Sequence, residues 1–460
     1  MNRLAVNNHA IHVKDQCFHK KSSTLLMRIS SHRFAFTCQP ACYILYQEPP
    51  EGGWPMSVLR NRSFSILLSG QLISMFGSNV FALALPWYVY LSTNSKLALA
   101  TVGFVQSLPN LAGLFAGVFV DRFKKRKTMV VVDLLRFGIS LFIGLIAYLK
   151  FPFPWIVLSV LLLQLAGVFF GPAVTVLIPL VVGDEQVPAA MGMNQSGGAL
   201  AQLAGQMGGG ALLVALGAPL LFIANGISFL VSVISLLFVR ADEPPRVVTS
   251  SSFFQEWREG LQWIGRSKMM ILILSASIVT NFGMAPFDIA MTAWVRGPLH
   301  ASAFWLGLIG AAFFVGIIVG GFLLGAVTKR VPLRTTLMLG LMIAGLTISA
   351  VGAFLSTYWA MGLLLICGLS VGILNGSLGA LLVRVVIPEM RGRVFGLVGA
   401  LATIATPLGL AVFGGMMVLV SLAHLFIMMG GLCFLGGVTM LLPIRDDLSK
   451  DALSARSLTS

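Results

Sequence analysis

Charged residues are scarce in this chain. Asp, Glu, Lys and Arg make up 10% of its 460 residues, whereas an ordinary soluble domain has about 25%. Apolar residues make up 57%, and so few charges cannot form the polar surface that a soluble globule of this length needs. The composition therefore excludes a soluble enzyme, a disordered chain and a fibrous protein, and it predicts that much of the apolar surface faces lipid.

The sequence also has few features that would support a cofactor or a metal. Its five cysteines form no CxxC pair, so neither a metal site nor a disulfide framework is indicated. It contains no Gly-x-x-x-x-Gly-Lys-Ser/Thr loop for nucleotide phosphates. We therefore expect no metal, no cofactor and no enzymatic activity, and an ion gradient as the energy source for any transport.

Long apolar runs are abundant, and each is close to the roughly 20 residues that a membrane-spanning helix requires. Twelve runs lie at 65–91, 98–120, 128–149, 154–180, 191–215, 218–239, 268–295, 303–327, 334–355, 359–383, 393–419 and 421–443. We predict an all-α membrane protein with twelve transmembrane helices in two six-helix, pseudo-symmetric bundles.

The polar segments divide the chain into five parts. Residues 1–55 are interpreted as a disordered tail or as a mis-assigned start, because Met56 opens a sequence typical of an inner-membrane protein. The two bundles are predicted at 56–240 and 268–444. A cytoplasmic linker at 241–267 carries a short amphipathic helix around 253–264, and a cytoplasmic tail follows at 445–460.

The net charge of +15 is explained by its placement. Loops on the side of the predicted linker hold most of the Lys and Arg, whereas the loops on the other side hold only Lys96, Lys150 and Arg296. Cytoplasmic loops of membrane proteins are enriched in Lys and Arg. We therefore predict cytoplasmic N- and C-termini in a bacterial inner membrane, and no nucleic-acid partner.

Similar loop motifs recur in the two halves. Gly117-Val-Phe-Val-Asp121-Arg122 follows the second run, and Gly325-Ala-Val-Thr-Lys329-Arg330 follows the eighth. Pro188 and Pro388 open the fifth and eleventh helices at a similar separation. Repeated halves of this kind are typical of secondary transporters.

These motifs resemble the major facilitator superfamily. Gly117, Asp121, Arg122, Lys125 and Arg126 are similar to its Gly-x-x-x-Asp-Arg-x-Gly-Arg-Arg loop. Further segments resemble the branch that holds the macrolide-efflux proteins and the enterobactin exporter. They are Gly70–Gly77, Ala84–Trp87, Asp133–Arg136, Phe170–Ala173 and Pro388–Gly396. In the fifth helix, Gln206 stands where antiporters of the superfamily often have proline.

The resemblance implies that the loop from Gly117 to Arg126 acts as a cytoplasmic latch. Asp121 can pair with Arg391 or Arg393 in one state and release in the other. The alternative is that these charges only set the topology.

Two further acidic residues lie inside apolar runs. Asp133 and Arg136 are spaced i, i+3 on one helix face, where they can pair, and we expect them to brace the gate; the alternative is a substrate-binding role. Asp288 lies toward the outer end of the seventh helix. It is interpreted either as a proton-coupling site or as an interfacial acid paired with Arg296.

Uncharged polar residues in the apolar runs are candidates for a substrate cavity. They are Gln71, Asn79, Gln106, Gln164, Asn281 and Asn375. The resemblance implies that helices 1, 4, 7 and 10 line the cavity, which contain five of the six. The alternative for each is a hydrogen bond to a neighbouring helix. Glycines of helices 5 and 8 are interpreted as sliding contacts between the halves, or as static packing.

We therefore predict a secondary active exporter of hydrophobic or amphipathic small molecules, working by alternating access with proton antiport. The protein is expected to be a monomer whose partners are its substrate, protons and the lipid bilayer. The alternatives are an exporter dedicated to a siderophore or another metabolite, a lipid flippase of the same fold, and a membrane scaffold that transports nothing.

Overall fold

The computed structural model describes residues 24–29, 32–37, 55–113, 123–240, 253–387 and 390–442. The chain divides into two units, Met1–Ser57 and Val58–Ser460. In the first, β1 (Thr24–Ile29) and β2 (His32–Thr37) form an antiparallel pair. The rest of the tail before residue 55 lies outside the described residues, so the interpretation of residues 1–55 stays a prediction.

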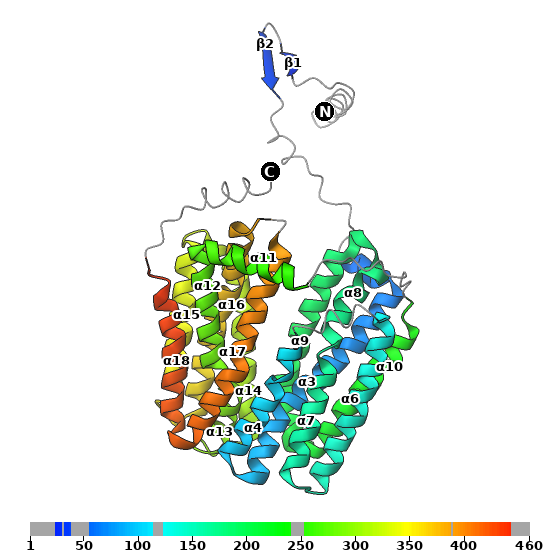
Figure 1. Ribbon diagram of the computed structural model, residues 1–460, viewed down its shortest axis with the longest axis vertical. Coiled ribbons are helices and arrows are strands. Elements are labelled where there is room, and N and C mark those ends of the chain that lie inside the picture. The colour runs from blue at the N-terminus through cyan, green and yellow to red at the C-terminus, as the bar shows by residue number, and fades with distance from the viewer. Residues whose placement is uncertain are drawn as a thin grey trace, which may run out of the picture. The chain divides into compact units, whose positions relative to one another are not determined.

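The second unit is helical throughout its described residues (Figure 1). Its first half contains η1 (Pro55–Arg60, which begins in the first unit), α3 (Arg62–Thr93), α4 (Lys96–Ser107), α6 (Lys125–Tyr148), α7 (Phe153–Gly167), α8 (Phe170–Val182), η2 (Asp184–Gln186), α9 (Val187–Leu216) and α10 (Ala218–Phe238). Its second half contains α11 (Phe253–Arg266), α12 (Lys268–Met284), α13 (Phe287–Arg296), α14 (Ala303–Thr328), α15 (Leu333–Val351), α16 (Thr357–Val385), α17 (Arg391–Leu419) and α18 (Leu422–Thr439).

Eleven spans among the described residues are long and apolar enough to cross a membrane. The helices α7 and α8 together form one span, and α12 and α13 form another. The remaining predicted span, 98–120, begins with α4 and continues past residue 113 into residues that are not described. The predicted all-α membrane fold is confirmed, with α11 at the position of the predicted amphipathic helix.

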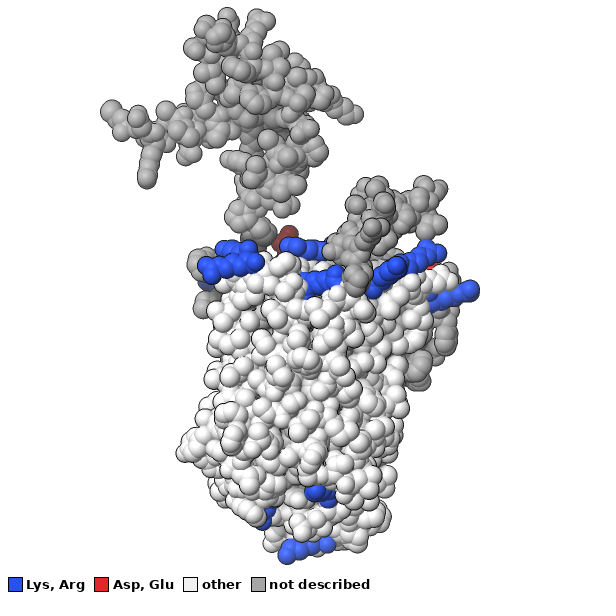
Figure 2. Space-filling view, turned by 90° about the vertical axis from the view of Figure 1, so that its left-hand side faces the viewer, with Lys and Arg blue, Asp and Glu red and all other residues white. Residues whose placement is uncertain are grey.

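The spans form two bundles in which corresponding helices have corresponding neighbours. In the first bundle α10 packs against α3 and α6, and in the second α18 packs against α12 and α15 (Figure 1). The helix α11 lies across one end of the second bundle and packs on α17. Lys and Arg gather at this end, which we call the basic end, and far fewer lie at the opposite end (Figure 2). Lys96 begins α4, Lys150 follows α6 and Arg296 ends α13, in connections at the end away from α11.

One arginine in each bundle closes the end of a helix. Arg126, the second residue of α6, donates to the carbonyl oxygens of Leu236 (2.8 Å) and Leu237 (2.7 Å) at the end of α10. Arg334, the second residue of α15, donates to Met440 (3.1 and 2.8 Å) and to Leu442 just past α18. A helix leaves its last carbonyls unpaired, and a cation there also interacts favourably with the helix dipole.

These two arginines are equivalent by position as well as by contact. They are separated along the chain by the same distance as Gly117 and Gly325 in the repeated loop motif. The same contact in both bundles is consistent with the predicted structural repeat, and it assigns Arg126 a role within its own bundle.

We expect Arg126→Ala and Arg334→Ala each to lower the free energy of unfolding by about 1–3 kcal/mol, because hydrogen bonds from a charged donor are lost. Lysine at either position should retain only part of the stability that arginine gives, because its ammonium group lacks the planar guanidinium that donates to two carbonyls at once. Thermal and denaturant unfolding of the purified protein in detergent measures both effects. Arg330→Ala, which removes an exposed side chain at the same end, is the control and should change little.

Candidate functional site

The two bundles touch where α9 crosses α14. A Cβ atom on Gly210 would lie 2.6 Å from the carbonyl oxygen of Ala303, and one on Gly307 would lie 2.6 Å from that of Gln206. Side chains cannot approach backbone this closely, so glycine at both positions allows the two helices to meet backbone to backbone. Gly307 is in the second turn of α14, which places the crossing near the opposite end of the molecule.

A second crossing, between α4 and α17, lies near the same end. A Cβ on Gly414 would be 2.8 Å from the Cβ of Ala100, and one on Gly103 would be 3.2 Å from side-chain atoms of Ile289 and Leu410. Ala100 and Gly103 belong to the first two turns of α4. Two glycine crossings therefore hold the bundles together at the opposite end.

Most other glycines of α9 and α14 pack within their own bundle. Gly197, Gly198 and Gly205 face Leu72, Met75 and Asn79 of α3. The backbones at Gly316 and Gly320 face that of α16. The interpretation as contacts between the halves is thus wrong for these glycines, although Gly210, Gly307 and Gly310 do make such contacts. Glycine content shows that a helix can approach another closely, but it does not show which helix that is.

The residues predicted for the latch are only partly described. Gly117, Asp121 and Arg122 lie outside the described residues, so any contact of Asp121 stays a prediction. Lys125 is buried and donates from Nζ to the carbonyl oxygen of Phe123 at 2.9 Å.

The two arginines expected opposite Asp121 have partners within the second half. Arg391 donates to the carbonyl oxygens of Val386 (3.2 Å) and Val383 (3.0 Å) at the end of α16. Arg393 forms an ion pair with Glu259 of α11, with 2.6 Å between Nη1 and Oε2. Both side chains of this pair are about two-fifths exposed. This ion pair fastens the amphipathic linker helix to the start of α17.

Asp133 and Arg136 lie together in the interior of the first bundle. Arg136 Nη1 is 3.6 Å from Asp133 Oδ1, and the aspartate side chain is fully buried. The guanidinium carbon lies 4.7 Å from the ring centre of Phe229 and 5.6 Å from that of Phe170. An arginine cation is attracted to aromatic faces at such distances. The contacts of the pair connect α6 to α8 and α10, and its role in bracing the gate stays a prediction.

Asp288 lies in the first turn of α13, and its side chain is exposed. A carboxylate is favoured there by the positive end of the helix dipole. Among the described residues it has no ion-pair partner, and Arg296 at the end of the same helix is also exposed. The structure thus does not bring Asp288 and Arg296 together.

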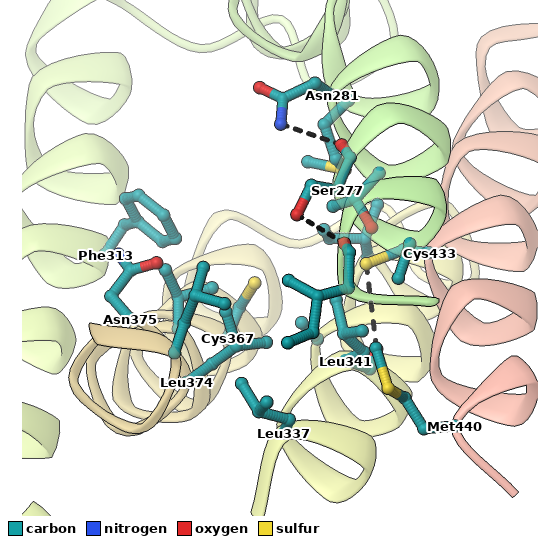
Figure 3. Close-up of a pocket in the computed structure, with 18 residues that line it drawn as sticks. Ser277, Asn281, Phe313, Leu337, Leu341, Cys367, Leu374, Asn375, Cys433 and Met440 are labelled. Carbon is teal, nitrogen blue, oxygen red and sulfur yellow. Dashed lines mark hydrogen bonds between the residues drawn. The ribbon is translucent and has the colours of Figure 1, made fainter. Parts of the chain in front are cut away.

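The predicted cavity residues separate into two groups. Asn281 and Asn375 line one cavity of about 200 Å³ inside the second bundle, between α12, α15, α16 and α18 (Figure 3). The other four, Gln71, Asn79, Gln106 and Gln164, do not line it. Gln71 is buried, and Asn79 donates to the carbonyl oxygen of Met75 one turn earlier at 2.7 Å.

Several lining residues were not among the predicted ones. Ser277, Thr280 and Met284 share the face of α12 that carries Asn281, and the buried thiols of Cys367 and Cys433 lie on α16 and α18. The spacing of Ser277, Asn281 and Met284 places them on one helix face and is a sequence signal that could have found them. The two cysteines are far apart in the sequence and gave no such signal.

Residues 54–457 match the major facilitator family that is described as transmembrane secretion effector. The chain belongs to this family of membrane transporters.

Two relatives carry the name of an efflux protein. Macrolide efflux protein A of Streptococcus pyogenes is 26% identical over 379 residues, covering 80% of this chain and 93% of the relative. The protein of the same name from Enterococcus faecalis is 27% identical over 327 residues, covering 68% and 98%. The predicted macrolide-efflux branch is thereby confirmed.

Solved structures show the same fold at low identity. The nucleoside transporter NupG has a TM-score of 0.69 at 10% identity, covering 83% of this chain and 99% of that one. A bacterial homologue of the iron transporter ferroportin has a TM-score of 0.66 at 16% identity, covering 83% and 98%. These likenesses establish the major facilitator fold.

We expect Gly307→Val to prevent the bundles from meeting at the opposite end, because its side chain would collide with the backbone of α9. Spin labels on Lys150→Cys and Leu355→Cys, in loops of the two bundles at that end, measure their separation. The distance distribution should shift to longer values, with transport lost. A Cβ on Gly321 of the same helix would meet no atom within 4 Å, so Gly321→Val is the control and should leave the distance and the transport unchanged. An unchanged distance in Gly307→Val would contradict the role of the crossing.

We expect Asp133→Ala to lower the free energy of unfolding by about 3–5 kcal/mol, because it leaves a buried cation without its partner. The double variant Asp133→Leu/Arg136→Met, which replaces both charges by apolar groups of similar size, should be much closer to wild type. Denaturant unfolding in detergent measures both. A stable Asp133→Ala protein that has lost transport would favour the substrate-binding alternative instead.

Proposed function

We propose that this transporter exports hydrophobic or amphipathic small molecules by alternating access. The observation that carries the proposal is the pair of glycine crossings at the opposite end. They join the two bundles through small, uncharged contacts, an arrangement that suits a rocking motion of one bundle against the other. The efflux function of the relatives supports the direction of transport.

The placement of charge supports an orientation for this motion. The basic end carries α11 and most of the Lys and Arg (Figure 2), and enrichment in these residues is typical of the cytoplasmic side. We infer that both termini are cytoplasmic and that the protein lies in the bacterial inner membrane. With this orientation, the glycine crossings close the outer side, and the described conformation is the one that takes up substrate from the cell.

Asp288 is the residue that we assign to proton coupling. The span of α12 and α13 lies at the interface between bundles, since α13 packs against α3 and α4 of the first bundle. The exposed carboxylate of Asp288 follows Met284, a lining residue of the cavity, by four residues in the chain. An acid on a transport pathway with no ion-pair partner among the described residues is suited to bind and release a proton.

The test is transport in proteoliposomes with and without an imposed pH gradient, using a panel of drugs and siderophores. Asp288→Asn should abolish the gradient-driven component while exchange without a gradient continues, and Asp288→Glu should keep coupling. Arg296→Gln should have no effect on coupling. If Asp288→Asn is driven normally by the gradient, the proton site is elsewhere; if Arg296→Gln abolishes coupling too, an interfacial ion pair is the better account.

A further inference from the structure

The cavity in the second bundle has a polar side and an apolar floor. Asn281 and Asn375 are exposed, whereas Cys367 and Cys433 are only 1% and 2% exposed. Figure 3 shows Asn281 and Ser277 on one side of the cavity and Asn375 and Phe313 on the other. The cavity therefore runs from an accessible polar mouth to a buried apolar interior.

Its size limits what can enter. Sites for drug-sized ligands usually have volumes of about 300–1,000 Å³, and an apolar cavity of about 150 Å³ is known to hold one benzene molecule. The cavity here, at about 200 Å³, accommodates one ring-sized or branched aliphatic group. A whole amphipathic drug does not fit in it.

Its interior favours an apolar occupant over water. Most of the lining is aliphatic, including Leu337, Leu341, Ala344 and Ile348 of α15. Water in a buried cavity needs two to four polar partners, and the buried polar groups of the lining are the hydroxyl of Thr280 and the two thiols, which are weak hydrogen-bonding groups. An empty cavity would also be unfavourable, because packing is lost in proportion to its volume.

The polar groups at the mouth can hold the part of a ligand that follows the apolar group. Asn281 donates from Nδ2 to the carbonyl oxygen of Ser277 at 2.9 Å, which leaves its side-chain oxygen as an acceptor. The exposed amide of Asn375 has no hydrogen-bond partner among the described residues, so it offers both a donor and an acceptor. The two amides thus frame the entrance with hydrogen-bonding groups.

We propose that this cavity is a subsite for a single aromatic or branched aliphatic arm of the exported substrate. Asn375 and Asn281 bind a hydroxyl, amide or carbonyl next to that arm, and the remainder of the molecule lies outside the cavity, beyond these two amides. This subsite rests on the proposed export function and adds to it the chemical class of the substrate: an amphipathic molecule with a compact apolar group beside a hydrogen-bonding one.

The test uses radiolabelled chloramphenicol, which has one aromatic ring next to a hydroxyl and an amide. Binding to the purified full-length protein is compared for wild type, Val371→Phe and Val383→Phe. Val371 lines the cavity, and its replacement by Phe fills part of it; Val383 is an exposed residue on the same helix and is the matched control. We expect Val371→Phe to raise the Kd by roughly tenfold or more, with Val383→Phe near wild type.

A second variant guards against misfolding. Asn375→Leu changes an exposed side chain at the mouth and should also weaken binding, while thermal unfolding shows that both variants are folded. Equal affinity in wild type, Val371→Phe and Asn375→Leu would overturn the subsite, and so would a wild-type protein that transports other compounds of the panel but does not bind chloramphenicol. Recovery of a lipid acyl chain from the cavity would overturn it as well. Failure of the export function is a separate result: wild-type proteoliposomes would then transport no compound at all.

Discussion

The lipid interior offers no hydrogen-bond partners, and the architecture depends on this constraint. Every polar backbone group inside the membrane must be paired within the protein. Helices satisfy most of them, and the last carbonyls of α10, α16 and α18 are bonded by Arg126, Arg391 and Arg334. Each of these arginines starts or nearly starts a neighbouring helix of the same bundle, so satisfying a helix end also ties two helices together.

The contacts within a bundle are stronger in kind than those between bundles. Inside, charged hydrogen bonds and the buried pair of Asp133 and Arg136 fix helices to one another, and the backbones of α14 and α16 meet at Gly316 and Gly320. Between the bundles, the described crossings are uncharged contacts at glycine, with the Gln206 side chain beside Gly310. Separating small apolar surfaces leaves no buried charge or unpaired backbone group behind, so the interface can open while each bundle remains intact.

The sequence predicted the features that the lipid bilayer imposes, which are the spans and the placement of charge. It did not predict which residues the glycines and amides contact. The long apolar runs predicted the spans, and the uneven distribution of Lys and Arg among the loops predicted the basic end. Both follow from the cost of placing charge in a bilayer. The partners of glycines and amides did not follow. Gly197 and Gly307 both lie in glycine-rich helices, but one faces its own bundle and the other the opposite bundle. Asn79, like Asn281, is an amide in an apolar run, but Asn79 lies on α3 of the first bundle, whereas the cavity lies within the second bundle.

The proposed subsite and the proposed proton site share one membrane span. Ser277, Asn281 and Met284 of α12 line the cavity, the helix is interrupted at Ala285 and Pro286, and Asp288 opens α13 immediately afterwards. An interruption at proline allows two helical segments to reorient. In the proposed mechanism, a group that fills the cavity acts on α12, and a proton on Asp288 acts on α13, which contacts α3 and α4 of the first bundle. Coupling between substrate and proton then needs no chain of residues between distant sites. Both ligands change the angle between α12 and α13, which are adjacent segments of the same span.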